Sequence, residues 1–212
     1  MSTDTYVYRI LHIDNLRWQL AHGLQCRSSA IVDPEFIDIG AKTVIDRRHE
    51  KQLPVTGSPH LSDFVPWYFG VNSVMLLNLL TGWKGVSKFA PGEIIHLVSS
   101  LEKLEAAGKR LVIADRNAAI AVAEFFEANV SWRDRLDWQA IRSDDFKKRP
   151  DDPGRFERRQ AECLVHGCVE VSLLEGICCA NDASKLKIQA ICKAAGANLR
   201  VAVRPQYYWG LT

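Results

Sequence analysis

A glutamate follows a stretch of the chain that is rich in charge. Residues 142–160 contain seven Lys/Arg and five Asp/Glu, together with two prolines and a glycine. The next residues, Ala161-Glu-Cys-Leu-Val165, are apolar apart from Glu162, which is typical of a strand. A carboxylate on a strand is rigidly placed and can stabilise positive charge that develops on a reacting group. It could equally form a plain salt bridge with Arg158 or Arg159.

Several other chemistries lack their motifs. There is no GxGxxG after the first strand-like segment and no Walker A loop, so neither a Rossmann NAD site nor a kinase-like nucleotide site is predicted. A GxSxG elbow and the HxE and PCxxC elements of zinc deaminases are also missing from the sequence. The six cysteines include no CxxC pair, so we expect reduced, mostly buried thiols and no metal.

Composition narrows the class of protein. A chain of 212 residues with 47% hydrophobic and 25% charged residues is ordinary for one globular domain. The formal net charge of +2 is too small to indicate a nucleic-acid partner by itself. The N-terminus lacks the pattern of a secretory signal, and apolar stretches such as residues 74–80 are too short to span a bilayer. We therefore expect a soluble, cytoplasmic protein without a membrane partner.

Strand-like and helix-like segments that could position these groups run along the whole chain. Alternating apolar residues predict strands at 6–12, 64–69, 94–98, 110–114, 161–165, 174–180 and 199–203. Helical spacing, with caps and glycine stops, predicts helices at 16–22, 74–80, 100–108, 118–128, 136–141 and 182–195. Pro66 favours an edge strand or the start of a strand.

The two remaining stretches lack a clear period. Residues 24–61 have an irregular pattern, which in a compact domain is usually functional or mobile. Residues 142–161 are interpreted as an exposed loop or frayed helix that leads to Glu162. Together the elements predict a single α+β domain over residues 1–212, with a mixed, mainly antiparallel sheet flanked by helices.

Four segments, taken in order, resemble the DarT family of DNA ADP-ribosyltransferase toxins. They are Tyr8-Arg-Ile-Leu-His-Ile-Asp-Asn-Leu16, Ile45-Asp-Arg-Arg48, Asp63-Phe-Val-Pro-Trp-Tyr-Phe69 followed by Asn72-Ser-Val-Met75, and Arg158-Arg-Gln-Ala-Glu-Cys-Leu-Val165. Weaker matches at Ile95-His-Leu-Val98 and Ile113-Ala-Asp-Arg-Asn117 lie between the third and the last. The resemblance extends from about Tyr6 to Tyr208, and the ordered set is more specific than any one motif.

The resemblance implies an ADP-ribosyltransferase-like fold whose split sheet holds NAD⁺ in a cleft between its halves. The family's catalytic glutamate maps onto Glu162, its base-activating arginine onto Arg48, and its nicotinamide-pocket aromatic onto Tyr68. The implied reaction transfers ADP-ribose from NAD⁺ to a base, thymine by resemblance, in single-stranded DNA and releases nicotinamide. A carboxylate would stabilise the oxocarbenium-like ribose, and a guanidinium would stabilise the base as it loses a ring proton.

Each carried-over role has a plainer alternative. Arg48 could be a solvated charge in the run 47–51, and either it or Arg47 could contact the base. Tyr68 could be a core aromatic, although strand alternation allows only one of two neighbouring rings to line a cleft. His12 and Asn15 could hydrogen-bond NAD⁺, or could serve a strand end and a helix cap.

The chain departs from the family pattern at three positions. Arg9 stands where members often carry histidine, and it could bind a phosphate of NAD⁺ bidentately. Asn117 stands where some members have histidine; it offers hydrogen bonds but cannot titrate. Cys163 replaces the usual phenylalanine beside the glutamate. These changes keep the reaction class and leave the preferred DNA sequence open.

The basic segment independently favours DNA binding. We expect single-stranded DNA to contact Arg47, Lys147, Lys148, Arg149, Arg155 and Arg158. A flexible strand presents its base without an unpairing cost, although the acids of the segment could cancel its bases. The resemblance also implies a DarG-type macrodomain antitoxin that acts in trans. Two other hypotheses are an ADP-ribosyltransferase with another acceptor (guanine, RNA or protein) and a catalytically silent nucleic-acid-binding module.

Overall fold

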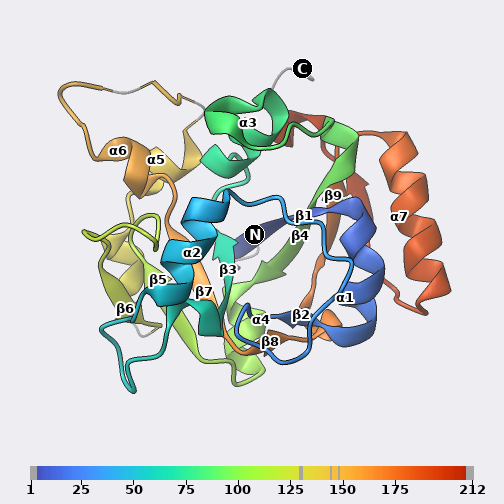
Figure 1. Ribbon diagram of the computed structural model, residues 1–212, viewed down its shortest axis with the longest axis horizontal. Coiled ribbons are helices and arrows are strands. Elements are labelled where there is room, and N and C mark those ends of the chain that lie inside the picture. Colours follow the sequence, from blue (N-terminus) through green and yellow to red (C-terminus); the bar gives the residue numbers. More distant parts are fainter. Residues whose placement is uncertain (1–3, 129–130, 144, 148, 209–212) are drawn as a thin grey trace.

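The computed structural model describes residues 4–128, 131–143, 145–147 and 149–208 (Figure 1). In this part of the chain an eight-stranded sheet has the order β10-β9-β4-β1-β3-β7-β5-β6. Its strands are β1 (Tyr6–His12), β3 (Phe64–Tyr68), β4 (Ile94–Ser100), β5 (Leu111–Ala114), β6 (Phe125–Glu127), β7 (Glu162–His166), β9 (Gly176–Cys179) and β10 (Val201–Val203). The β9–β10 pair is parallel and the other neighbours are antiparallel, so the predicted mixed sheet is confirmed.

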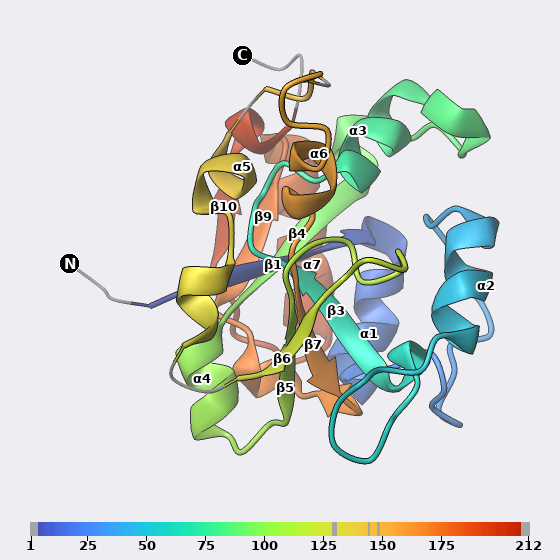
Figure 2. The same ribbon diagram turned by 90° about the vertical axis from the view of Figure 1, so that its left-hand side faces the viewer.

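Helices flank this sheet on both sides, with α2 and α5 on opposite sides of it (Figure 2). They are α1 (Leu16–His22), α2 (Lys42–Glu50), α3 (Val74–Thr81), α4 (Leu101–Ala106), α5 (Trp138–Arg142), α6 (Arg155–Arg158) and α7 (Asp182–Ala194). A separate antiparallel pair joins β2 (Leu24–Gln25) to β8 (Cys168–Val169). Within the described residues, no helix combines the length and the apolar character needed to cross a membrane.

The sheet divides between β1 and β3. These strands pair at one described position, Tyr8 opposite Tyr68, whereas β1 pairs with β4 along its full length and β3 does so with β7. The expectation that Pro66 marks an edge or a strand start is wrong, because β3 lies inside the sheet. The proline is tolerated because β1 has already diverged there, and the Pro66 carbonyl instead accepts a hydrogen bond from Arg9 Nη1 at 3.0 Å.

Two further expectations are corrected. Residues 118–128 form turns and then β6 rather than a helix, because polar side chains satisfy the local backbone: Asp115 accepts from the Glu124 N–H and Asn117 from the Ala119 N–H, each at 2.9 Å. Residues 24–61 are not irregular throughout, since they contain α2. This helix has no buried residue and no side-chain hydrogen bond at its N-cap, so neither usual signal of a helix was present.

Capping residues in the sequence correctly predicted where a helix begins and ends. Ser73 accepts a hydrogen bond from the Leu76 N–H at 3.1 Å and begins α3, and Gly82 ends it with φ of 73°. Alternation along β3 places Trp67 in the main core, where it is fully buried, and Tyr68 on the opposite face. The sheet face that carries Tyr68 is therefore the one available to a site.

Candidate active site

A cavity of about 340 Å³ is lined by residues from both halves of the divided sheet. Arg9 comes from β1, Tyr68 from β3 and Glu162 from β7, while α2 contributes Arg48 and α3 contributes Asn78. Because the two halves part between β1 and β3, the cavity walls come from segments that are far apart in the sequence. Tyr68, onto which the family resemblance maps the nicotinamide-pocket aromatic, is one of the residues that line this cavity.

Glu162 is 1% exposed and receives three hydrogen bonds. Arg48 Nη1 donates to Oε1 at 3.1 Å and Arg48 Nη2 donates to Oε2 at 2.9 Å, which is a bidentate pair. The backbone N–H of Ala118 donates to Oε1 at 3.0 Å. A carboxylate offers about four acceptor positions. Donors from the described residues occupy three of them and leave one position, on Oε2.

The strands fix the direction of this carboxylate. Glu162 stands directly opposite Tyr68 on β3 and opposite Ala114 on β5, and residues paired in this way share one face of a sheet. The neighbouring Cys163 stands opposite Trp67 and is buried in the core on the other face. The sheet therefore directs the Glu162 side chain into the cavity and the Cys163 side chain into the core.

The salt bridge that Glu162 makes is not the one expected from its sequence neighbours. Its partner is Arg48, and Arg158 instead binds Asp137 and Asp152. Burial lowers the pKa of the Arg48 guanidinium, but the charge and hydrogen bonds of Glu162 more than offset this and raise it. Arg48 is therefore not a solvated member of its charge run, whereas Arg47 is exposed.

A second guanidinium lies in the same cavity. Arg9 is half-buried, and burial, followed by the like charge of Arg48, lowers its pKa to about 10, so it stays protonated at neutral pH. Burial and then the charge of Glu162 raise the pKa of Tyr68, so its phenol keeps its proton. Arg9 and Arg48 thus place two guanidinium groups beside the carboxylate of Glu162, while the lining as a whole, with Arg27, Asp33 and Asp38, balances three arginines against three carboxylates.

His12 and Asn15 do not line the cavity. His12 Nδ1 accepts from the Asp14 N–H at 3.3 Å, at the end of β1. The amide of Asn15 donates to the Ile37 carbonyl and accepts from the Ile37 N–H, both at 2.9 Å. These contacts anchor the loop that leads into α2, so Asn15 helps to place the helix that carries Arg48.

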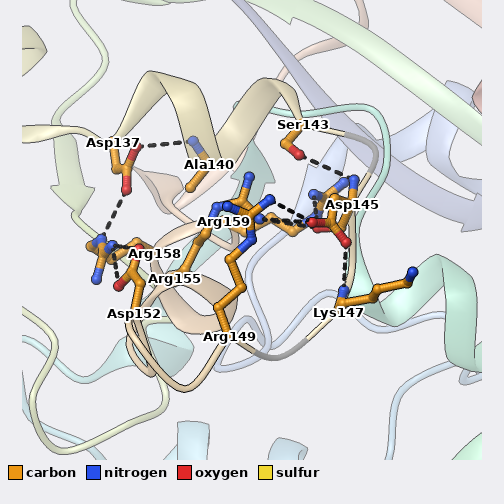
Figure 3. A network of polar contacts seen from close by, with 10 residues as sticks. All are labelled: Asp137, Ala140, Ser143, Asp145, Lys147, Arg149, Asp152, Arg155, Arg158 and Arg159. Atoms are coloured by element: carbon orange, nitrogen blue, oxygen red, sulfur yellow. Dashed lines mark hydrogen bonds and ion pairs between the residues drawn. The ribbon is translucent and has the colours of Figure 1, made fainter.

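Three arginines before Glu162, namely Arg149, Arg155 and Arg158, contact nearby acids (Figure 3). Arg149 donates to Asp145 at 2.8 Å, and Arg155 donates to the Asp145 carbonyl at 3.2 Å. Arg158 binds Asp152 at 2.8 Å and Asp137 at 3.0 Å, whereas the Lys147 side chain is exposed. Lys148 lies outside the described residues. The acids of the segment thus organise its arginines.

Sequence reasoning missed the turn that follows β5. Asn117 accepts from the Ala119 N–H and donates to Gln160 Oε1 at 3.2 Å, which directs the Ala118 N–H at Glu162. The signal was the run of polar residues after β5, which was interpreted as a helix cap. Among the described residues no group of three or more His, Cys, Asp or Glu side chains could hold a metal ion.

Comparisons with known proteins show which family this chain resembles. A family model described as ssDNA thymidine ADP-ribosyltransferase, DarT, matches residues 8–209. A DNA ADP-ribosyl transferase of Escherichia coli O127:H6 is 32% identical over 203 residues, which are 96% of this chain and 93% of that protein.

Solved structures agree with the sequence matches. Thermus sp. 2.9 DarT in complex with ADP-ribosylated ssDNA superimposes with a TM-score of 0.89 and 29% identity, over 97% of this chain and 96% of that one. The same protein in complex with NAD⁺ gives a TM-score of 0.83 and 28% identity, over 98% and 99% of the two chains.

A divided sheet with a buried glutamate in its cleft, together with these matches, defines an NAD⁺-dependent DNA ADP-ribosyltransferase. The chain belongs to the DarT family of single-stranded-DNA thymidine ADP-ribosyltransferases. The fold, the activity and the co-substrate NAD⁺ that the sequence resemblance implied are thereby confirmed.

Proposed function

We propose that Glu162 is the catalytic carboxylate and Arg48 the base-stabilising group of a transfer from NAD⁺ to a thymine ring nitrogen in single-stranded DNA. The observation that carries this proposal is the arrangement at Glu162. It is a buried carboxylate with three hydrogen-bond donors, in the wall of a cavity that also holds Arg9 and Tyr68.

Glu162 acts on the ribose. When the bond between C1′ and nicotinamide breaks, the electron pair leaves with nicotinamide and the ribose becomes positively charged. A fixed carboxylate stabilises that charge, and such electrostatic groups contribute about 10²–10³ in rate. The free acceptor position on Oε2 can take a hydrogen bond from a ribose hydroxyl and so fix the orientation of the sugar.

Arg48 can serve Glu162 and the base together. A guanidinium has five N–H donors, and two of them engage the carboxylate. Three donors remain for the thymine, whose ring nitrogen attacks C1′ as its proton passes to solvent. Because Glu162 raises its pKa, Arg48 stays cationic and stabilises the base anion rather than accepting the proton. Arg47 is exposed and is assigned to the DNA backbone.

The other cavity residues would bind NAD⁺. We assign the Arg9 guanidinium to the pyrophosphate, because it stays protonated and has donors beyond the one used by Pro66. We assign the ring of Tyr68 to the nicotinamide. His12 and Asn15 are supporting residues in this proposal, since their contacts hold the end of β1 and the loop before α2.

Two segments would contact the substrates, residues 24–61 for NAD⁺ and DNA and residues 142–161 for DNA. Phosphate contacts are assigned to Lys147, Lys148, Arg149, Arg155 and Arg158. The chain would act as a cytoplasmic toxin opposed in trans by a DarG-type macrodomain, as the family resemblance implies. Pull-down of a tagged Glu162→Gln chain with such a macrodomain tests that partnership separately from activity.

Mass spectrometry of random single-stranded oligonucleotides, treated with the enzyme and NAD⁺, tests the acceptor. The expected product carries one ADP-ribose on thymidine and reports the surrounding sequence. Parallel reactions with RNA and with protein complete the test. ADP-ribose found on guanine, RNA or protein, but not on thymidine, would overturn the assigned acceptor, and product from Glu162→Gln at the wild-type rate would overturn the catalytic role.

A further inference from the structure

A buried histidine that does not line the cavity connects two parts of the molecule. His96 is fully buried in β4, where it stands opposite Ile10 of β1 and Cys178 of β9. Its Nε2 lies 3.1 Å from the Val71 carbonyl oxygen, and its Nδ1 lies 3.2 Å from the Tyr208 hydroxyl. Because a carbonyl oxygen only accepts, Nε2 is protonated and donates a hydrogen bond to Val71. The proposed transfer reaction makes no use of this side chain.

Two tyrosines fix the orientation of the imidazole ring. The Tyr208 hydroxyl donates to the Ile94 carbonyl at 2.8 Å, which anchors the hydroxyl beside Nδ1. The rings of Tyr207 and Tyr208 both meet the His96 ring edge-on, with centroids 5.6 and 5.2 Å away. A side chain packed in this way keeps one orientation, so its Nε2–H is directed at Val71 before any ligand binds.

Val71 lies in the connection between β3 and α3, residues 69–73. The strand β3 belongs to the half of the sheet formed by β3, β7, β5 and β6. The helix α3 packs on the other half, where Leu76 shares an apolar cluster with Ile94 of β4. The connection therefore crosses the division of the sheet between β1 and β3, and His96 ties it to β4 at its midpoint.

The cavity has a wall on each side of this crossing. Tyr68 lies immediately before the connection, Met75 and Asn78 of α3 lie just after it, and all three line the cavity. Since β1 and β3 pair at one described position, sheet hydrogen bonds do little to fix the distance between the walls. An unmade hydrogen bond to a buried carbonyl is unfavourable, so the bond from His96 to Val71 resists widening of the cavity.

We infer that His96 is a positioning residue for NAD⁺. Its Nε2–H holds the Val71 carbonyl and thereby fixes the spacing between Tyr68 on one wall and α3 on the other. It acts on the binding of NAD⁺ and not on the chemistry, because the contacts between Arg48 and Glu162 do not involve it. This inference rests on the proposed function, which assigns the cavity to NAD⁺.

The variants His96→Gln and His96→Asn separate the two sides of the imidazole. The glutamine amide reaches about as far as Nε2 and can donate to Val71, whereas the asparagine amide reaches only as far as Nδ1. We expect His96→Asn to raise the KM for NAD⁺ about tenfold. Its kcat and its KM for a thymidine-containing oligonucleotide should change less than about twofold, and His96→Gln should stay within about twofold of wild type in all three constants.

Tyr208→Phe is the matched control. It removes a buried hydroxyl on the other side of the His96 ring and leaves the bond from Nε2 to Val71 in place. Like His96→Asn it should lower the thermal unfolding midpoint, but it should retain the wild-type KM for NAD⁺. Val71→Gly loosens the connection and leaves His96 intact. It should show the same rise in KM as His96→Asn, and it decides the test if His96→Asn does not fold.

Three results would overturn the inference. They are an unchanged KM for NAD⁺ in His96→Asn and Val71→Gly, an equal rise in His96→Gln, and an equal rise in Tyr208→Phe. If wild type modifies no oligonucleotide, the proposed function fails, but calorimetric titration with NAD⁺ still tests His96. The Kd should then be about tenfold higher in His96→Asn than in wild type, and an equal Kd in the two proteins would overturn the inference.

Discussion

The Arg48–Glu162 and Arg149–Asp145 pairs have nearly equal N–O distances, 2.9 and 2.8 Å, but lie in different surroundings. The side chains of the first pair are 18% and 1% exposed, and those of the second are 48% and 32% exposed. Two charges interact far more strongly where water is excluded than at a surface, where solvent and salt screen them. The same pair of groups can therefore carry chemistry in one place and arrange a loop in the other.

The two regions also differ in whether a charged group has a second partner of opposite charge nearby. In the α5–α6 region Asp145 lies near two arginines, and Arg158 binds two carboxylates, so the removal of one side chain leaves an alternative pairing. At Glu162 the carboxylate has one described cationic partner. Loss of either member leaves a buried group without its counter-charge, which is costly. The comparison predicts large, specific effects in the cavity and small, salt-sensitive effects in the loop.

The largest effect is expected for Glu162→Gln. The amide cannot stabilise the positive ribose, so kcat should fall about 10³-fold. The thermal unfolding midpoint should fall as well, because Arg48 loses its counter-charge in a partly buried position. Product formation with saturating NAD⁺ and DNA, and a melting curve, measure the two effects. Glu124→Gln, at an exposed carboxylate, is the control and should alter neither.

The pair Arg48→Lys and Arg47→Lys separates a buried guanidinium from an exposed one. Lysine keeps the charge but cannot bridge both oxygens of Glu162 and the base, so Arg48→Lys should lower kcat about 10²-fold. Arg47→Lys should change kcat less than about twofold, because its charge remains in solvent. Equal losses in the two variants would contradict the assignment of the base-stabilising role to Arg48.

His96 lies outside the cavity, and no ion pair with a described residue offsets the cost of its burial. Burial lowers the pKa of this fully buried histidine from its ordinary value to about 4. The unfolded chain therefore binds a proton at higher pH than the folded chain does. Stability is retained above about pH 6.5 and falls as pH decreases toward 4, by about 3 kcal/mol in total. Urea unfolding across this pH range should show the loss, and His96→Gln should show a smaller one.

Asn117 tests how much one backbone donor of the cavity, the Ala118 N–H, contributes. Asn117→Ala removes the hydrogen bond to the Ala119 N–H, loosens the turn that holds the Ala118 N–H on Glu162, and should lower kcat about three- to tenfold. The KM for NAD⁺ should change little. Asn117→Ser retains an acceptor for the same turn and should recover part of kcat. A loss shared equally by both variants would contradict a role in placing the backbone donor.

The smallest effect is expected for Arg149→Gln on stability. Asp145 keeps Arg155 nearby, and the Arg149–Asp145 pair is exposed, so the thermal midpoint should match wild type at physiological salt. Any difference at low ionic strength should disappear as salt is added. A fall comparable to that of Glu162→Gln would break the distinction between the two regions.

Sequence alone determined those features that depend on near neighbours. Strand alternation placed Tyr68 and Trp67 on opposite faces, and capping side chains such as Ser73 marked a helix start, because both effects act over a few residues. The ordered family motifs indicated Glu162 and Arg48. The same local reasoning failed at residues 118–128, where side chains that can cap a helix closed turns instead.

Tertiary structure alone decided how the site is assembled. Arg48 and Glu162 are 114 residues apart, and Ala118 is 44 residues from the glutamate to which it donates. The division of the sheet at Pro66 and the formation of α2 likewise depend on which strands and loops meet, which no short window of sequence contains. Glu162 has adjacent arginines in the sequence, but its partner is a distant one, because the sheet turns its side chain toward α2 and away from its neighbours.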